Sequence, residues 1–226
     1  MMKTWILLFI NFFLCAVMLK GESALTSFPC EVQAHEEGIN HKKMEELKYH
    51  YMYPHPSVTT DNVIFGFDGK SVNVLLIERG GEPYKGCWAF PGGFLEMDES
   101  AEEGARRELM EETGLKTAVV KQFHAFSAPD RDPRERVLTI AYYSVVRQSE
   151  VKGMDDAQQA KWFPLNAVPK QLAFDHEEML RVAKEEISKE IRLQTKTWLE
   201  MMKVFSPEEV KIIEEELISP CDGQSF

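Results

Sequence analysis

The chain has 226 residues, of which 44% are hydrophobic, so it can form one domain of ordinary size with a real core. Its net charge of −11 argues against a broad nucleic-acid surface, which needs clustered lysines and arginines. A small anionic ligand is not excluded, because a site can carry its own local charge and recruit metal ions. The four cysteines, Cys15, Cys30, Cys87 and Cys221, show no CxxC spacing, so the sequence indicates neither a zinc site nor a disulfide framework.

The N-terminal residues 1–23 form a segment distinct from the rest of the chain. Lys3 precedes an almost unbroken apolar run, Trp5–Leu19, which is typical of a signal peptide or of a short membrane anchor. A third interpretation is that this region is not translated and that Met44 is the true start. The protein is expected to be cytoplasmic in that case, and otherwise secreted or membrane-anchored through residues 1–23. Residues 24–50 are expected to be a linker.

The first predicted elements of the folded part are two strands, Ser57–Phe67 and Val72–Arg79, because β-branched residues are frequent in both. The turn signal Asp68-Gly69 between them predicts a hairpin. The tetrapeptide Cys87–Phe90 is expected to be extended, and Pro91-Gly92-Gly93 is expected to break it.

Strands and helices continue to the C-terminal end. Further strands are predicted at 118–126, 137–146 and 160–165. The pattern becomes helical from Asp175 to about Met202, and a second helix is predicted after Ser206, with Pro207 first and Glu209 completing a capping box. This order predicts a mixed sheet packed by helices, in the α/β or α+β class.

One acidic stretch, Gly92–Leu115, holds eight carboxylates. A helix from Ala101 to Thr113 is predicted inside it. Ser100 is a good N-cap and Glu103 completes a capping box, while Gly114 suits the position after the helix. The acidic stretch therefore begins as a loop and ends as a capped helix.

Three glutamates of this helix, Glu108, Glu111 and Glu112, fall within an arc of about 100° when each residue turns the helix by about 100°. Like charges on one arc repel each other and cost helix stability. One interpretation is a solvated acidic face. The other is a site for hard divalent cations such as Mg²⁺ or Mn²⁺, which prefer oxygen ligands. The glycines of Pro91-Gly92-Gly93 favour the second, because they let the backbone approach a ligand.

The same stretch resembles a complete Nudix box. The matching positions, at fixed spacing and without departure, are Gly93, Glu99, Arg107-Glu108-Leu109, Glu111-Glu112 and Gly114-Leu115. The resemblance extends over residues 51–178, where the pattern is similar to the ADP-ribose pyrophosphatase-like branch, and leaves 179–226 as a C-terminal helical extension.

The resemblance implies a Nudix-type α/β/α sandwich with a mixed central sheet and C-terminal helices. It also implies metal-dependent hydrolysis of the pyrophosphate bond of a nucleoside diphosphate linked to another moiety, with ADP-ribose or a related nucleotide sugar as the expected substrate. The implied ligands of Mg²⁺ or Mn²⁺ are the carbonyl of Gly92 and the carboxylates of Glu108, Glu111 and Glu112. Arg107 would orient a glutamate through charge-assisted hydrogen bonds, and Glu99 would be structural or outer-sphere.

The general base stays open at this point. Glu108 or Glu112 of the box would serve, and so would a carboxylate on a distant loop, for which Asp155 and Asp156 are the candidates. For these two aspartates the alternative interpretation is a solvated turn.

Substrate contacts are expected from the upstream strand and the charged loop. The candidates are Arg79, Arg131, Arg134 and Phe126. The alternatives are surface ion pairs of the arginines with Asp130, Asp132 or Glu135, and a place in the core for Phe126. His176 either reaches the site or simply begins a helix.

A different class of function is a ligand-sensing transcription regulator that carries a Nudix-like domain without catalysis. The intact box favours an enzyme, and the acidic, mostly helical tail after Lys170 argues against DNA binding. The expected partners are therefore a small nucleotide substrate and a second copy of the chain in a homodimer, with no nucleic acid. A membrane is expected only if residues 1–23 are retained as an anchor.

Overall fold

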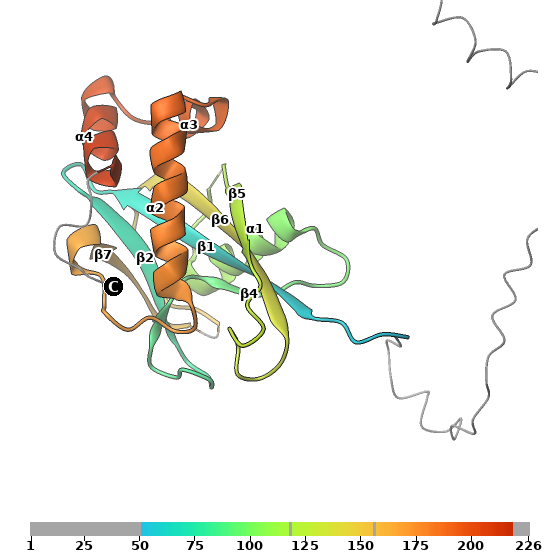
Figure 1. The fold of residues 1–226 in the computed structure, drawn as a ribbon. Coiled ribbons are helices and arrows are strands. Elements are labelled where there is room, and N and C mark those ends of the chain that lie inside the picture. The colour runs from blue at the N-terminus through green and yellow to red at the C-terminus, as the bar shows by residue number, and fades with distance from the viewer. Residues whose placement is uncertain (1–50, 118, 156, 219–226) are drawn as a thin grey trace, which may run out of the picture. The chain divides into compact units, whose positions relative to one another are not determined.

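The computed structural model describes residues 51–117, 119–155 and 157–218 (Figure 1). The predicted signal peptide or anchor, the linker and the alternative start at Met44 lie outside these residues, as does Asp156. Among the helices that these ranges contain, none combines the length and hydrophobicity that crossing a bilayer requires. Tyr51 begins the compact unit that is described below.

A seven-stranded mixed sheet forms the centre of this unit. Its strands are β1 (Ser57–Phe67), β2 (Val72–Arg79), β3 (Trp88–Ala89), β4 (Gly92–Phe94), β5 (Lys121–Phe126), β6 (Val137–Arg147) and β7 (Ala157–Pro164). The main order is β3-β2-β1-β6-β5, with β4 paired to β1 and β7 paired to β2. The central pair, β1 and β6, is parallel, while the other pairs are antiparallel.

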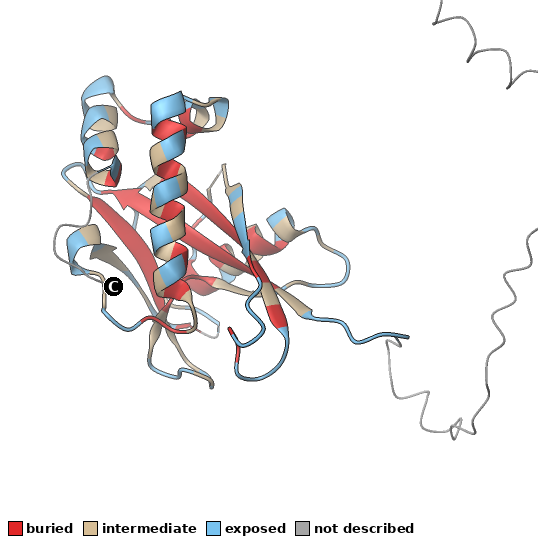
Figure 2. Cartoon of the chain, in the orientation of Figure 1, coloured by how far each residue is buried: buried red, intermediate tan, exposed pale blue. Residues whose placement is uncertain are grey.

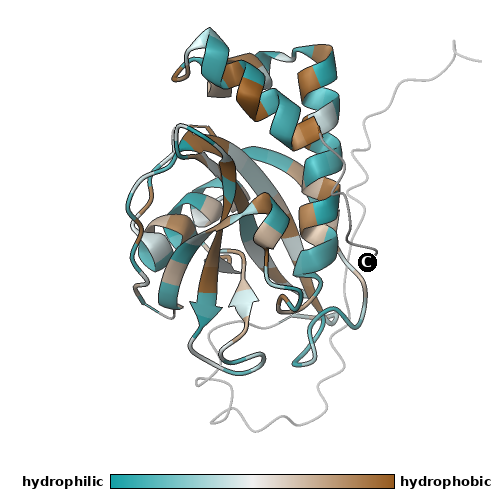
Figure 3. Ribbon diagram, turned by 90° about the vertical axis from the view of Figure 1, so that its left-hand side faces the viewer, coloured by the Kyte–Doolittle hydropathy of each residue, from teal (hydrophilic) through white to brown (hydrophobic). Residues whose placement is uncertain are grey.

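Helices cover both faces of the sheet, which confirms the predicted sandwich (Figure 1). They are α1 (Ala101–Thr113), α2 (His176–Leu193), α3 (Lys196–Met202) and α4 (Pro207–Ile218), and a short 3-10 helix η2 spans Leu165–Ala167. The C-terminal helices pack on one face and α1 packs on the other. Figure 2 shows the strands buried between them, and Figure 3 shows hydrophobic and hydrophilic residues alternating along the C-terminal helices.

The alternation of side chains along β1 explains both layers, because successive residues of a strand point to opposite faces. Val63, Phe65 and Phe67 belong to the core shared with the C-terminal helices. Ile64 packs instead with Leu109 of α1. Asp61, two residues before Val63, points to the same face of β1. A polar side chain therefore borders the core on this face.

Local signals predicted most element boundaries correctly. Helix α1 has the predicted bounds, with Ser100 as N-cap in a complete capping box and Gly114 in the left-handed region at φ 73°. The predicted hairpin of β1 and β2 is confirmed. The helix after Ser206 is confirmed too, and the Ser206 N–H donates to Glu209 at 2.7 Å.

Three predictions about the chain path were wrong. The predicted strand at 118–126 begins only at Lys121. The single helix from Asp175 to Met202 is broken, because Gln194 adopts φ 46° and Thr195 then caps α3. This break lets Trp198 turn into the core, where it is fully buried.

The third error concerns Gly92 and Gly93, which were expected to break a strand and to let the backbone approach a ligand, but not to form a strand of their own. They form β4, which pairs antiparallel with β1 and sets Gly92 opposite Asp61. An added Cβ at Gly92 would collide with the carbonyl oxygen of Thr60, so the close approach of the two strands requires glycine there.

Candidate active site

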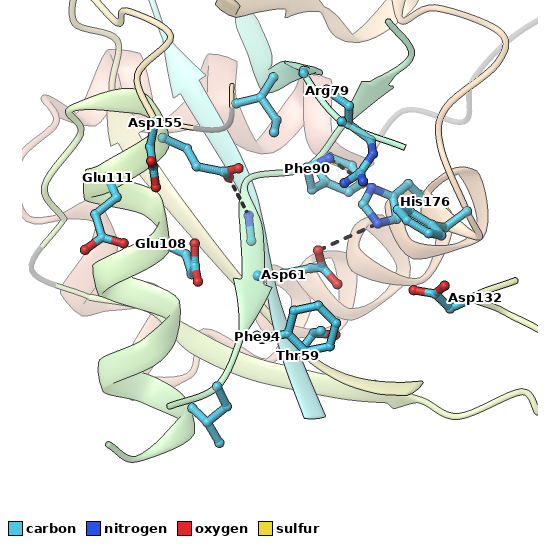
Figure 4. A pocket seen from close by; sticks show the side chains of 18 of the residues that line it. Thr59, Asp61, Arg79, Phe90, Phe94, Glu108, Glu111, Asp132, Asp155 and His176 are labelled. Carbon is cyan, nitrogen blue, oxygen red and sulfur yellow. Dashed lines mark hydrogen bonds and ion pairs between the residues drawn. The ribbon is translucent and has the colours of Figure 1, made fainter. Parts of the chain in front are cut away.

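A pocket of about 560 Å³ opens where α1, β4 and the segment before α2 meet (Figure 4). One wall is formed by carboxylates of α1 and by Asp155. The opposite wall carries arginines from the end of β2 and from the loop before β6, together with several aromatic side chains and His176. The residues used below that line the pocket are Asp61, Arg79, Phe94, Arg107, Glu108, Glu111, Glu112, Arg131, Asp132, Arg134, Asp155, Phe174 and His176.

Helix α1 presents its glutamates to the pocket from a firmly capped position. The N–H of Ser100 donates to Glu103 Oε2 at 2.8 Å, and the N–H of Gly114 donates to the Met110 carbonyl at 2.9 Å. A good N-cap contributes about 1 kcal/mol to helix stability. The helix is therefore held at both ends, and the direction of its acidic arc is fixed.

Arg107 binds three glutamates at once, as the predicted orienting residue should. Its Nε and Nη2 donate to the two carboxylate oxygens of Glu99 at 2.9 and 2.6 Å. Its Nη1 donates to Glu108 Oε1 at 2.8 Å and to Glu111 Oε2 at 2.9 Å. The hydrogen bonds to Glu99, followed by those to the other two glutamates, hold the pKa of Arg107 above its ordinary value.

Glu112 is the most buried carboxylate of the arc, with 5% of its surface exposed. It accepts one hydrogen bond at 2.8 Å from the N–H of Gly92. Burial, and then the charges of Glu108 and Asp61, raise the pKa of Glu112 to about 8. Burial also raises the pKa of Glu108, although Arg107 opposes this rise. Carboxylates with raised pKa values inside a cleft are typical of a functional site.

The donor set of the arc fits a hard divalent cation, because such ions bind carboxylate oxygens and stabilise buried negative charge. Gly93 makes room for one of these groups, since a Cβ there would lie 2.5 Å from Glu108 Oε1. Among the described residues, however, no three acidic, histidine or cysteine side chains converge in an arrangement ready to hold a metal ion. Glu108 and Glu111 are turned toward Arg107, and Glu112 toward Gly92.

The charged loop brings Arg131 and Arg134 to the pocket wall, but both are already paired. Arg131 is buried and makes a bidentate contact to Asp175, with Nε–Oδ2 at 2.9 Å and Nη2–Oδ1 at 2.7 Å. This partner was not among the acidic neighbours considered from the sequence. Arg134 forms a bidentate pair with Asp132 at 3.0 and 2.7 Å, as the alternative interpretation predicted. Both arginines therefore shape the wall in this structure.

Arg79 is the pocket arginine that has no carboxylate partner within the described part of the chain. Its Nε donates to the Pro83 carbonyl at 2.9 Å, and its Cζ lies 4.9 Å from the ring centroid of Phe174. Burial, and then the charge of Arg134, lower the pKa of Arg79. Of the three predicted arginine contacts, Arg79 is thus best placed to receive an anionic group.

Phe126, predicted to stack on a base, does not reach the pocket. It is buried in the core beside Phe123, with ring centroids 6.2 Å apart. The stacking prediction was wrong because the end of β5 packs against the C-terminal helices. One aromatic residue that does line the pocket is Phe174, which adopts φ 53° and packs on Tyr84 at 4.8 Å between centroids. A left-handed backbone at a bulky residue is uncommon and recurs at functional sites.

Two further groups join the pocket through the fold. His176 both begins α2 and lines the pocket, so the two interpretations of this residue hold together. Asp61 lies on the pocket floor beside His176, as Figure 4 shows. Asp61 was missed in the sequence, although a carboxylate in the apolar alternation of β1 was a readable signal.

Comparison with known proteins agrees with this geometry. The NUDIX domain model matches residues 55–183, which is more than half of the chain. The chain is 45% identical to an ADP-ribose pyrophosphatase of Methanocaldococcus jannaschii, over 62% of this chain and 79% of the relative. It is 34% identical to the ADPR responsive transcriptional repressor NtrR of Acinetobacter baylyi, over 58% of this chain and 54% of that relative.

Solved structures share the fold. The NUDIX domain of Shewanella oneidensis NrtR complexed with ADP ribose matches at a TM-score of 0.58 and 27% identity, covering 66% of this chain and 99% of that chain. A bifunctional NMN adenylyltransferase/ADP ribose pyrophosphatase of Francisella tularensis, complexed with AMP and a Mn ion, matches at 0.51 and 28%, covering 60% and 43%. A match of the family model over more than half of the chain shows that this protein belongs to the Nudix family.

Proposed function

We propose that the protein hydrolyses the pyrophosphate bond of ADP-ribose, or of a related nucleotide sugar, with Mg²⁺ or Mn²⁺ as cofactor. The observation that carries this proposal is a pair of carboxylates, the partly buried Glu108 and the buried Glu112, whose pKa values are raised. They lie in a pocket beside Gly92 and Gly93, where a side chain would not fit. The pyrophosphatase of Methanocaldococcus jannaschii, at 45% identity, supports the substrate class.

The residues that would hold the cation are Gly92, Glu108, Glu111 and Glu112. When bound, the cation would neutralise charge on the pyrophosphate and lower the pKa of a coordinated water. Arg107 keeps Glu108 and Glu111 side by side before binding, so that little conformational entropy is lost when they engage a ligand. Glu99 holds Arg107 in place through its ion pair and does not line the pocket, so in this scheme it contacts neither the cation nor the substrate.

The opposite wall would bind the rest of the substrate. Arg79 can donate its free guanidinium nitrogens to a phosphate oxygen, because arginine suits bidentate contacts with phosphate. Phe94 and Phe174 line the same side and offer apolar surface. For the general base, Asp155 is the loop candidate that reaches the pocket, whereas Glu108 is bound to Arg107.

The sensing function without catalysis has support from NtrR, but two observations favour the enzyme. All box glutamates are present, and Glu108, Glu111 and Glu112 line the pocket. Helix α4 carries five glutamates, Glu208, Glu209, Glu214, Glu215 and Glu216, whose charges oppose the approach of a nucleic-acid backbone.

A substrate panel tests the proposal. The full chain should release AMP and ribose 5-phosphate from ADP-ribose when Mg²⁺ or Mn²⁺ is present, and should be inactive with a chelator. Glu112→Gln should lose this activity. Its matched control is Glu102→Gln, since Glu102 lies on the same helix but pairs with Arg106 away from the pocket. If no nucleoside diphosphate derivative is turned over with either metal, the enzyme proposal is wrong.

A further inference from the structure

Asp61 interrupts the apolar face of β1 at the point where the core ends. The next residues on this face, Val63 and Phe65, are fully buried and pack under the C-terminal helices. Asp61 is itself only 7% exposed, although it carries a carboxylate. Burying such a group is costly unless other groups compensate it, so its presence here calls for a specific explanation.

The side chain of Asp61 makes no hydrogen bond to any residue that the structure describes. Its two nearest charged or titratable neighbours stand beyond hydrogen-bonding distance. His176 Nε2 is 3.7 Å from Oδ1, and Arg131 Nη2 is 4.0 Å from Oδ2. The carboxylate thus keeps acceptor positions open, and it lies on the floor of the pocket (Figure 4).

Both neighbours are held in place by other bonds. The N–H of Phe90 donates to His176 Nδ1 at 2.9 Å, so in the neutral ring the proton is on Nε2 and faces Asp61. Burial lowers the pKa of His176, which keeps the ring neutral. Arg131 is fixed by its bidentate pair with Asp175. Each oxygen of Asp61 therefore has an N–H donor standing beside it at a fixed position.

An acceptor and a donor side by side are the complement of a hydroxyl group, which donates one hydrogen bond and accepts another. Two such pairs on one carboxylate match two neighbouring hydroxyl groups. Vicinal hydroxyl groups of this kind occur on a ribose, and acidic side chains bind ribose hydroxyl groups in other nucleotide sites.

The position of Asp61 relates this feature to the proposed reaction. Gly92 pairs with Asp61 across the β1–β4 ladder and donates its N–H to Glu112. The carboxylate therefore lies one strand away from the acidic arc, where a sugar attached to the pyrophosphate would be found.

We propose that Asp61, with His176 and Arg131 beside it, binds the vicinal hydroxyl groups of a ribosyl unit of the substrate and makes the site selective for ribose over deoxyribose. This inference rests on the proposed function, because it concerns the sugar next to the scissile pyrophosphate. A ribose that carries a phosphate on one of these hydroxyl groups would be rejected by the negative charge of Asp61.

Three substrates test the proposal on the full chain with Mg²⁺: ADP-ribose, its analogue deoxygenated at the adenosine 2′ position, and its analogue with a terminal 2-deoxyribose. The wild-type protein should cleave one analogue about 10- to 100-fold less efficiently than ADP-ribose in kcat/KM, the range for one charge-assisted hydrogen bond. Asp61→Asn should lose a similar factor for ADP-ribose, mainly through KM, and should no longer discriminate against that analogue.

Asp132→Asn is the matched control for Asp61→Asn, because Asp132 also lines the pocket but its carboxylate is already used by Arg134. This variant should keep the ratio between the substrates, whatever its effect on their common rate. Equal efficiency of the wild-type protein with all three substrates overturns the inference without any variant. Discrimination that persists in a folded Asp61→Asn variant also overturns it. Absence of turnover with every substrate instead refutes the proposed function itself.

Discussion

Replacing Glu112 with glutamine should separate the stability of the protein from its activity. Glutamine has the same shape and can still accept the Gly92 N–H, but it cannot ionise. Activity should fall by orders of magnitude, because the variant lacks a proposed cation ligand. In the absence of metal, the same change should stabilise the fold at alkaline pH, because it removes a buried charge that the pocket does not compensate.

The pKa of Glu112 sets the size and sign of this effect. Its pKa rises from 4.5 in a free carboxyl group to about 8 in the folded protein. Below pH 4.5 the group is protonated in both states. Between these values the unfolded chain ionises while the folded protein keeps its proton, so stability is lost as the pH rises and levels off above about 8. Each pH unit in this range lowers the free energy of unfolding by about 1.4 kcal/mol, so the total decrease reaches at most about 4 kcal/mol at pH 8.

The assay is thermal and urea unfolding of the chelator-treated proteins between pH 5 and pH 8.5. The glutamine variant should be close to the wild type at the acidic end and increasingly more stable toward pH 8, with about 2–4 °C in Tm for each kcal/mol. Added Mg²⁺ or Mn²⁺ should narrow the gap by stabilising the wild type, because a ligand of the native state shifts unfolding by mass action. A variant that is equally or less stable at pH 8 without metal would refute the reasoning.

Two other variants address the remaining pocket residues. Asp155→Asn should lower kcat about 100-fold if this loop carboxylate is the general base, with the affinity for the metal unchanged in a titration; a normal kcat would assign the base to the box glutamates. Arg131→Ala should destabilise the fold by about 1–3 kcal/mol in urea unfolding, because Asp175 loses a buried bidentate partner. Turnover should fall as well, because Arg131 stands beside Asp61 at the proposed ribose contact. Unchanged stability of the Arg131→Ala variant would refute the structural role of the Arg131–Asp175 pair.

The parts of the site that depend on neighbours in sequence could be predicted. Helix α1 was predictable to the residue, because Ser100 and Gly114 cap it through contacts made within one turn. Glu108, Glu111 and Glu112 share an arc through helical geometry alone, and the box spacing assigned Arg107 its role. The pairing of Arg107 with Glu99 involves residues separated by only eight positions.

The three arginines of the opposite wall were candidates from the sequence, but their pairing could not be predicted, because this wall is assembled by contacts between distant segments. Arg131 meets Asp175 across 44 positions of sequence, and neither residue identifies the other by its local pattern. Phe126 ends β5 and Phe174 precedes α2, and only the packing of the C-terminal helices decides which of the two aromatic residues faces the pocket. The break after α2 has the same origin, since the burial of Trp198 competes with continuation of the helix.

The pairing of β4 with β1 makes the length of one short connection critical. Side chains of a strand alternate between faces, so a shift of β4 by one residue would exchange its two sides. Ala89 of β3 and Gly92 of β4 are separated by only two residues, Phe90 and Pro91. This connection is too short to accommodate an inserted residue without moving β4. One added residue there would displace the N–H that binds Glu112 from its position opposite Asp61, and would misalign both halves of the pocket together. Residues 80–87, which connect β2 to β3, instead hold Arg79 through the Pro83 carbonyl, so a change of length there would act on the wall with the arginines and not on the β4–β1 register.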